Sequence, residues 1–288
     1  MPELPEVETT LRGLQPQLLG ETIEQLVVRQ AQLRWPIPVT LADHIAQQTI
    51  QALSRRGKYL LIHLASGTIL CHLGMSGSFR ITSPQSPLRR HDHVDFILSH
   101  HKILRYHDPR RFGAILWIEQ TPDEHPLLRK LGIEPLANEF CGEYLYQASR
   151  LRKTAIKAFL MNHQIVVGIG NIYATEALFL AKINPKVPAN ALTSNQYEIL
   201  TMCIKQVLTE AITAGGTTLR DFVNSDGNAG YFAQKLHVYG RATQPCFDCK
   251  TPIQSVVISQ RSSAFCPQCQ PPLVLSKGAI KTFDNRRG

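Results

Sequence analysis

The first eighteen residues carry apolar side chains at helical spacing. These side chains recur every three or four positions, at Val7, Leu11, Leu14 and Leu18. Pro5 lies near the start of the pattern and Gly20 just beyond its end. Proline is tolerated in the first turn of a helix, and glycine is typical after the last one. The pattern therefore predicts an amphipathic helix that ends near Leu18.

After this helix the period of the apolar positions changes to two. Turn residues separate seven short runs of this kind: Gln25–Gln30, Tyr59–Leu64, Thr68–Leu73, Gly77–Ile81, Val94–Leu98, Ile103–His107 and Ala114–Glu119. Such runs are typical of strands that bury one face. They predict an antiparallel β-sandwich or barrel in the first half of the chain.

From about Gly142 the spacing becomes helical again. One helix face collects Tyr197, Leu200, Ile204, Val207 and Ala211. Thr193 and Gln196 have the spacing of a capping box before this helix, and Gly215-Gly216 is expected to end it. Another helix is expected over Ile172–Ala181. The chain is therefore predicted to be α+β, with its strands first and most of its helices after them.

Length and composition agree with a folded protein. The chain has 288 residues, of which 43% are hydrophobic and 18% charged. This length allows two domains with their own cores and excludes general disorder. The start lacks the pattern of an export signal, and no run approaches the ~20 apolar residues that span a bilayer. We therefore expect a cytoplasmic protein without a membrane segment.

Charge is distributed unevenly along the chain. The net charge is +9, yet the first 24 residues hold five carboxylates and one base, Arg12. Thr49 to Ile115 contains ten bases and three acids, and Arg241 to Gly288 contains seven bases and two acids. Two separated basic regions can line two sides of one groove. This distribution favours an anionic polymer as the partner.

Four of the seven cysteines form two closely spaced pairs near the end of the chain. The pairs are Cys246 and Cys249, and Cys266 and Cys269, with 16 residues between them. This separation suits a connecting β-hairpin, and four thiolates complete a tetrahedral Zn²⁺ site with no open position. We therefore expect one structural zinc ion. Two surface disulfides or four idle thiols are the alternatives.

The other three cysteines lack this spacing, and we expect Cys71, Cys141 and Cys203 to be small apolar core residues. Between the zinc-binding pairs, Val256–Ile258 is predicted to be a strand and Gln260–Ser263 the exposed turn at the hairpin tip. Arg261 in that turn could bind a phosphate through two hydrogen bonds, or it could be a solvated loop charge.

Pro2 offers unusual chemistry if the initiator methionine is removed. A terminal proline has a secondary amine, and α-amino groups titrate near ~7.7–8.0, so much of it is unprotonated at neutral pH. Such an amine can attack a sugar C1′ and form an iminium that permits elimination. Glu3 lies beside it as a proton donor or acceptor. The alternative is that Pro2 only starts a turn before the helix.

Several ordered motifs together resemble one family. The opening Pro2–Glu8 resembles the N-terminal signature of formamidopyrimidine-DNA glycosylases, bacterial base-excision enzymes that share a fold with endonuclease VIII. The resemblance continues through Gly57–Tyr59, His72–Gly77, His91–Asp95, Asp108–Gly113, Gly168–Ala174 and the cysteine pairs. It implies a β-sandwich domain with a flanking helix over residues 1–131 and a helix-two-turn-helix domain over 132–243. A zinc-finger hairpin over 244–270 and a flexible basic tail over 271–288 complete the expected order.

The resemblance also implies roles for individual residues. The catalytic residues would be Pro2 as nucleophile, Glu3 as proton shuttle and Lys58, which also approaches a phosphate. The DNA contacts would be His72, Met75, His93, Arg110, Phe112, Asn171, Arg220, Tyr239 and Arg261.

Among these contacts, Met75, Arg110 and Phe112 would fill the space left by an everted nucleotide and contact the orphaned base. Asn171 and Arg261 would bind phosphate, with backbone amides after the Gly168-x-Gly170 turn converging on the same oxygens. Arg220 would lie in a lid over the everted base. Because His93 and His91 flank Asp92, they resemble a metal pattern, but we expect hydrogen bonding and no second metal.

The expected function is a bifunctional DNA glycosylase and AP lyase that removes oxidised purines such as 8-oxoguanine and formamidopyrimidines. The opening Glu3-Leu4-Pro5 differs from the Glu-Gly-Pro start typical of endonuclease VIII. This difference favours oxidised purines over oxidised pyrimidines as the substrates of this chain. The alternatives are an endonuclease VIII-type oxidised-pyrimidine glycosylase and a non-catalytic, zinc-dependent protein that binds damaged DNA. The partner would be damaged or abasic double-stranded DNA, bound by a monomer.

Overall fold

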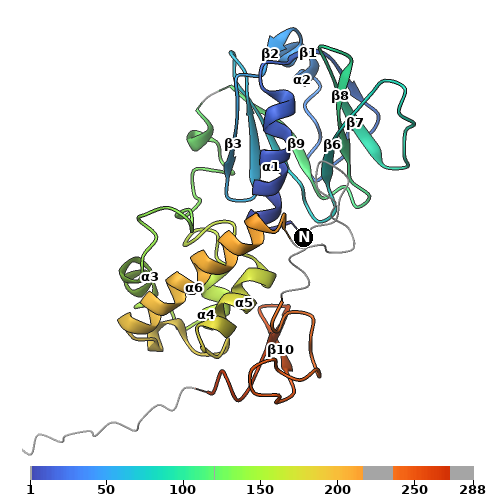
Figure 1. Ribbon diagram of the computed structural model, residues 1–288. Helices are drawn as coiled ribbons and strands as arrows, with labels where there is room; N and C mark the ends of the chain where they lie inside the picture. The colour runs from blue at the N-terminus through green and yellow to red at the C-terminus, as the bar shows by residue number, and fades with distance from the viewer. Residues whose placement is uncertain (1, 120, 217–235, 273–288) are drawn as a thin grey trace, which may run out of the picture.

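A computed structural model describes residues 2–119, 121–216 and 236–272 of the chain. A lobe rich in strands and a helical lobe lie one above the other, and a small hairpin module lies beside the helical lobe (Figure 1). The N-terminus lies at the junction of the lobes. Two expectations, the role of Arg220 and the flexible tail, concern segments that fall wholly or mostly outside the described residues.

The first lobe is an antiparallel sandwich of two sheets. The five-stranded sheet has the order β2-β1-β7-β8-β6, with β1 Thr22–Val28, β2 Gln48–Thr49, β6 Ser78–Thr82, β7 Asp92–Leu98 and β8 Lys102–His107. The four-stranded sheet has the order β3-β4-β5-β9, with β3 Ala52–Arg56, β4 Tyr59–His63, β5 Thr68–His72 and β9 Ala114–Ile118. The predicted sandwich is thus confirmed.

The seven predicted strands are present, with ends that differ by a few residues, but two strands were not predicted. Strand β2 has only two residues, too few for a periodic pattern. Strand β3 has the sequence Ala-Leu-Ser-Arg-Arg, in which only Leu53 is buried. An edge strand that buries one apolar side chain gives little alternation, so the sequence signal is weak.

Helix α1, Leu4–Leu18, flanks the sandwich as predicted. It buries Val7, Leu14 and Leu18 in the sandwich core, and it also contacts the long helix α6 of the other lobe. A short helix α2, Leu41–Ile45, and a 3₁₀ turn η1, Pro122–Glu124, complete this half of the chain. Helix α1 therefore carries the N-terminus to the contact between the lobes (Figure 1).

The helical lobe packs around its own apolar core. Its elements are α3 Gly142–Ser149, α4 Ile156–Leu160, α5 Asn171–Leu180, η2 Ala189–Ala191 and α6 Ser194–Thr213. The predicted capping box is present, because the Thr193 hydroxyl accepts from the backbone N–H of Gln196 at 3.2 Å. Helix α6 ends two residues before Gly215, whose φ is +78°, so the predicted glycine stop is confirmed.

The hairpin module consists of β10, Gln254–Ile258, and β11, Arg261–Phe265. The turn between them is Ser259-Gln260, both with positive φ, as two-residue hairpin turns require. The expected tip of Gln260–Ser263 was wrong, since Arg261 already pairs with Ile258 in the sheet. Cys71 is buried as expected, but Cys141 is exposed at the start of α3 rather than in the core.

Within the ranges that the structure describes, no helix is both long and apolar enough to cross a membrane.

Candidate active site

Glu3 fixes the N-terminal segment against the helical lobe. It is the N-cap residue of α1, and its backbone N–H donates to the Glu6 carboxylate at 2.8 Å in a capping box. The Glu3 carboxylate in turn accepts the backbone N–H groups of Gly170 at 2.7 Å and Ile172 at 2.9 Å. An anion at a helix N-terminus is stabilised by the helix dipole and the unpaired amides. Glu3 thus occupies the start of α5.

This contact corrects one expectation about phosphate binding. The amides after the Gly168-x-Gly170 turn were expected to converge on a phosphate, but Glu3 already uses them. Gly170 is required here because a Cβ on it would lie 2.4 Å from the Glu3 carboxyl carbon. The backbone N–H of Leu4 also donates to the carbonyl of Gly168 at 3.0 Å. This turn therefore anchors the N-terminus.

Lys58 and Glu3 form an electrostatically linked pair beside buried Pro2. Burial raises the pKa of Glu3, and the nearby Lys58 ammonium partly offsets this effect. Burial lowers the pKa of Lys58, while the carboxylates of Glu3 and Glu6 oppose the shift. Groups whose pKa values are moved towards neutrality are suited to proton transfer. Glu3 and Lys58 are thus close enough to interact, and Pro2 directly precedes Glu3 in the chain.

The position of Lys58 depends on a clamp between the lobes. Gly57, with φ +58°, and Lys58 form the two-residue turn between β3 and β4. The Glu134 carboxylate accepts the Gly57 backbone N–H at 2.6 Å and the Arg55 guanidinium at 2.8 Å. Arg55 also donates to Glu8 of α1 at 3.0 Å. The clamp joins the Lys58 turn, α1 and the chain that connects the lobes.

A buried lysine that we did not predict lies under the phosphate-binding candidates. Lys157 of α4 has no exposed surface, and its Nζ donates to Asn171 Oδ1 at 2.6 Å and to Ser263 Oγ at 2.6 Å. Burial lowers the pKa of Lys157 to about 8. The signal was available in the sequence, because Lys157 interrupts the apolar run Ala155–Leu160.

Asn171, Tyr239 and Arg261 come together above Lys157. Asn171 Nδ2 donates to the carbonyl of Ser262, next to Arg261, at 3.1 Å. Burial raises the pKa of Tyr239, and its hydrogen bond with Asn171 acts in the opposite direction. Arg261 is exposed and close enough to Lys58 to lower the pKa of that lysine. The arrangement concentrates positive charge and hydrogen-bond donors beside Lys58.

Met75, Arg110 and Phe112 lie on two adjoining loops of the sandwich. The buried Asp108 carboxylate accepts the hydroxyl of Ser76 at 2.9 Å and the backbone N–H of Gly113 at 2.8 Å, which ties the loops together. The Arg110 guanidinium lies 5.0 Å from the centre of the exposed Phe112 ring. The cationic and the aromatic side chain thus lie close together, and the loop that carries the apolar Met75 adjoins theirs.

His72 has a defined tautomer. Its Nδ1 accepts the backbone N–H of Gly74 at 2.9 Å, so the proton of the neutral ring lies on Nε2. Burial lowers the pKa of His72 to about 4, and the nearby cations Lys58 and Arg34 add smaller effects in the same direction. At neutral pH His72 is therefore an uncharged hydrogen-bond donor.

His93 lies in a different environment from the other expected contacts. It is buried, and its Nε2 lies 2.8 Å from the carbonyl oxygen of Asp108. The His91 ring centre is 6.0 Å away, while Asp92 pairs with His107 and Arg80 instead. The expected hydrogen bonding exists, but its partners lie outside the His91–His93 segment. A direct contact of His93 with DNA remains a prediction.

The four paired cysteines converge on one point. The sulfur atoms of Cys246, Cys249, Cys266 and Cys269 all lie within 4.8 Å of one another. Four thiolates at this separation fit one tetrahedral Zn²⁺ and leave no position for substrate. The residues therefore form a structural zinc site, as predicted.

Removal of zinc is expected to weaken DNA binding without unfolding the two large lobes. Cys249→Ser or a chelator should release β11, which carries Arg261 and supplies the carbonyl that holds Asn171. Because zinc binding drives the folding of such modules, we expect affinity for abasic duplex DNA to fall at least about tenfold. Metal analysis and titration would check this.

Cys141→Ser is the matched control, because Cys141 is exposed and outside the cluster. Native zinc content and affinity in Cys249→Ser would contradict the assignment.

Comparison with known families accounts for most of the chain. The N-terminal domain of formamidopyrimidine-DNA glycosylase matches residues 1–115, and the helix-two-turn-helix domain of the same enzyme matches residues 131–223. A zinc finger found in this glycosylase and in isoleucyl-tRNA synthetase matches residues 244–272.

Whole proteins show the same relationship. The formamidopyrimidine-DNA glycosylase of Magnetococcus marinus is 54% identical over 273 residues, which cover 94% of this chain and 99% of that protein. The one from Marinobacter nauticus is 50% identical and covers 94% of this chain and 100% of its own length.

Solved structures agree. The MutM (Fpg) protein of Thermus thermophilus has a TM-score of 0.84 at 36% identity, covering 93% of this chain and 98% of its own. A complex of Lactococcus lactis Fpg with DNA containing an abasic site has a TM-score of 0.85 at 33% identity, covering 93% and 99%. The chain belongs to the formamidopyrimidine-DNA glycosylase family. It is a DNA glycosylase of base-excision repair, with the AP lyase activity that is standard in this family.

Proposed function

We propose that the secondary amine of Pro2 is the nucleophile of this glycosylase and lyase. The proposal requires that Pro2 becomes the first residue of the mature chain. The nitrogen lone pair then forms a bond to C1′ of the damaged nucleotide, while the glycosidic bond breaks and its electron pair leaves with the base. The single observation that carries the proposal is the position of Pro2: it is buried near the junction of the lobes and directly precedes Glu3, whose carboxylate interacts with Lys58.

Glu3 moves protons at the sugar and the leaving base. Burial raises the pKa of Glu3, which favours the protonated carboxyl that a proton donor needs. After its attack the nitrogen loses its proton, the C1′–O4′ bond breaks and O4′ takes up a proton. The opened sugar then carries an iminium at C1′, which acidifies the C2′–H bond. Loss of that proton expels the 3′ phosphate, and a second elimination expels the 5′ phosphate. Lys58 binds a phosphate beside the reacting sugar and supports these proton transfers.

The DNA contacts divide between the sandwich lobe on one side and the helical lobe with its hairpin module on the other. Asn171, Tyr239 and Arg261 bind the backbone of the damaged strand, with Lys157 holding Asn171 from below, and His72 donates to a further phosphate. Met75, Arg110 and Phe112 fill the gap left by the everted nucleotide, since apolar wedges and Arg side chains stabilise unstacked duplexes. Arg220 is proposed to read the everted base, and His93 to contact DNA. The assignments of Arg220 and His93 rest on family likeness alone, and the others rest on family likeness and on the contacts described above.

The substrate is proposed to be duplex DNA that contains oxidised purines, and the enzyme removes these bases. It is proposed to act as a monomer in the cytoplasm. The solved complexes support this class, since a mutant of Lactococcus lactis Fpg was crystallised with Fapy-dG DNA; the wild-type form of the same enzyme was crystallised with DNA containing an oxidised pyrimidine.

A comparison of lesions tests the substrate class. We expect incision of an 8-oxoguanine duplex to exceed that of a thymine glycol duplex by at least about tenfold in kcat/KM, because one extra discriminating contact is worth 1–3 kcal/mol. Single-turnover incision of both duplexes by the same preparation measures the ratio. A preference for thymine glycol would favour the endonuclease VIII type, and binding without incision would favour a non-catalytic protein.

A further inference from the structure

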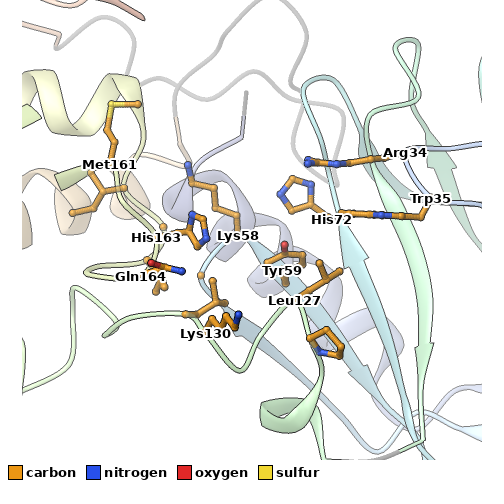
Figure 2. A pocket seen from close by; sticks show the side chains of 16 residues that line it. Arg34, Trp35, Lys58, Tyr59, His72, Leu127, Lys130, Met161, His163 and Gln164 are labelled. Carbon is orange, nitrogen blue, oxygen red and sulfur yellow. The ribbon is translucent and has the colours of Figure 1, made fainter. Parts of the chain in front are cut away.

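A cavity of about 430 Å³ lies beside Lys58 between the two lobes. In Figure 2 its walls come from three parts of the chain. The sandwich lobe supplies Arg34 and His72, the segment before the helical lobe supplies Lys130, and the segment between α4 and α5 supplies His163 and Gln164. We call it the Lys130 pocket.

The charge of the Lys130 pocket is one-sided. Its lining includes the cations Arg34, Lys58 and Lys130, and among the described residues it contains no carboxylate. Arg34 stacks on the ring of Trp35 at 4.7 Å, which leaves its N–H groups free to bind an anion. Glu3 and Glu6 partly offset the charge of Lys58, and Arg34 and Lys130 add positive charge to a space that no carboxylate lines, which favours the entry of an anion.

Polar donors extend this surface towards the solvent. Lys130, His163 and Gln164 are all exposed, and Figure 2 shows them around the side of the cavity below Lys58. An ammonium, an imidazole and a side-chain amide offer N–H groups in different directions. Such a set matches the several acceptor oxygens of a phosphate.

Lys58 connects the Lys130 pocket to the phosphate-binding candidates described above. It lines the pocket, and it lies close enough to Arg261 for the two charges to interact. Neither Arg261 nor Asn171 lines the pocket. Positive charge therefore continues from the zinc-finger hairpin through Lys58 into the pocket. A single DNA strand, with a phosphate at every nucleotide, is the anion that such a row of sites fits.

We propose that the Lys130 pocket binds a second phosphate of the damaged strand, next to the phosphate at Lys58, and that Lys130 and His163 hold it. The inference rests on the proposed function, because it assumes that Lys58 contacts the damaged strand. The phosphate is either a diester of the intact backbone or the terminal monoester that elimination leaves. Lys130 acts on binding and touches no reacting atom.

The test measures the affinity of native protein, Lys130→Ala and Lys153→Ala for duplexes with a stable abasic analogue. Lys153 is the matched control, because it is an exposed lysine that does not line the pocket. We expect Lys130→Ala to raise Kd about three- to tenfold and to reduce the slope of log K against log salt by about 0.9. Lys153→Ala should show a smaller effect on both.

Methylphosphonate substitution then locates the phosphate. Backbone phosphates of the damaged strand are neutralised one at a time. At one position the substitution should lower the affinity of the native protein but cause no further loss of affinity in Lys130→Ala. A nicked duplex with terminal phosphates, measured beside the intact one, separates the sources. A penalty on the intact duplex identifies the diester, and a penalty confined to the nicked duplex identifies the monoester.

Additive effects at every position, or native affinity in Lys130→Ala on both duplexes, would overturn the inference. Borohydride trapping of the same variants keeps the two proposals apart. Normal trapping with unchanged affinity refutes the Lys130 pocket alone, whereas a loss of trapping in the native protein refutes the proposed chemistry.

Discussion

A chain with extra residues fused before Pro2 is expected to lose both base excision and strand cleavage. The fusion converts the secondary amine into an amide, whose lone pair is delocalised and cannot attack C1′. We expect the single-turnover rate on an 8-oxoguanine duplex to fall by about a thousandfold or more, as removal of a nucleophile does in other enzymes. Denaturing gels of the cleaved strand measure this rate.

The same fusion with a protease site directly before Pro2 provides the control. Cleavage that leaves Pro2 as the first residue should restore the rate, and binding to a stable abasic analogue should change much less than the rate. An extended chain that cleaves lesion DNA at the native rate would show that Pro2 is not the nucleophile.

Glu3→Gln is expected to slow base release by about a hundredfold to ten-thousandfold. The amide cannot transfer protons, so departure of the base loses its assistance. Cleavage of a preformed abasic site should fall less, because no base has to leave. The pKa of Glu3 is raised above its usual 4.5, and a proton donor is active only while protonated, so the native rate of base release should fall as pH rises through this raised pKa. That fall should be absent in Glu3→Gln.

Stability measurements separate this chemistry from a folding effect. Glu3 also accepts the N–H groups of Gly170 and Ile172, and glutamine keeps only one of the two acceptor oxygens. Thermal unfolding and affinity for a stable abasic analogue should therefore be recorded for the variant. Native base release by a folded Glu3→Gln protein would exclude Glu3 as the proton shuttle.

The periodic parts of the chain were predictable because each encodes its fold locally. The spacing from Val7 to Leu18, the capping box at Thr193 and the cysteine pairs all depend on residues near one another in sequence. The turn at Gly57 was also visible, since a two-residue hairpin needs positive φ. These local patterns are enough to predict both lobes and the zinc module.

The contacts between the lobes were not predictable in this way. Glu134 and Arg55 are 79 residues apart, and nothing in either local sequence indicates that they meet. The amides at Gly170 suggested a phosphate site, but the Glu3 carboxylate binds there, because one helix N-terminus offers the same donors to either anion. Lys157 was detectable only as a charge within an apolar run.

The position of the covalent bond tests the central claim most directly. Native protein, reduced with borohydride during reaction with 8-oxoguanine DNA, would be digested with a protease and nuclease and analysed by mass spectrometry. We predict a deoxyribose-derived adduct on the nitrogen of a peptide that begins at Pro2. An adduct on Lys58 or another side chain, or an active chain whose N-terminal peptide still begins with methionine, would contradict this account.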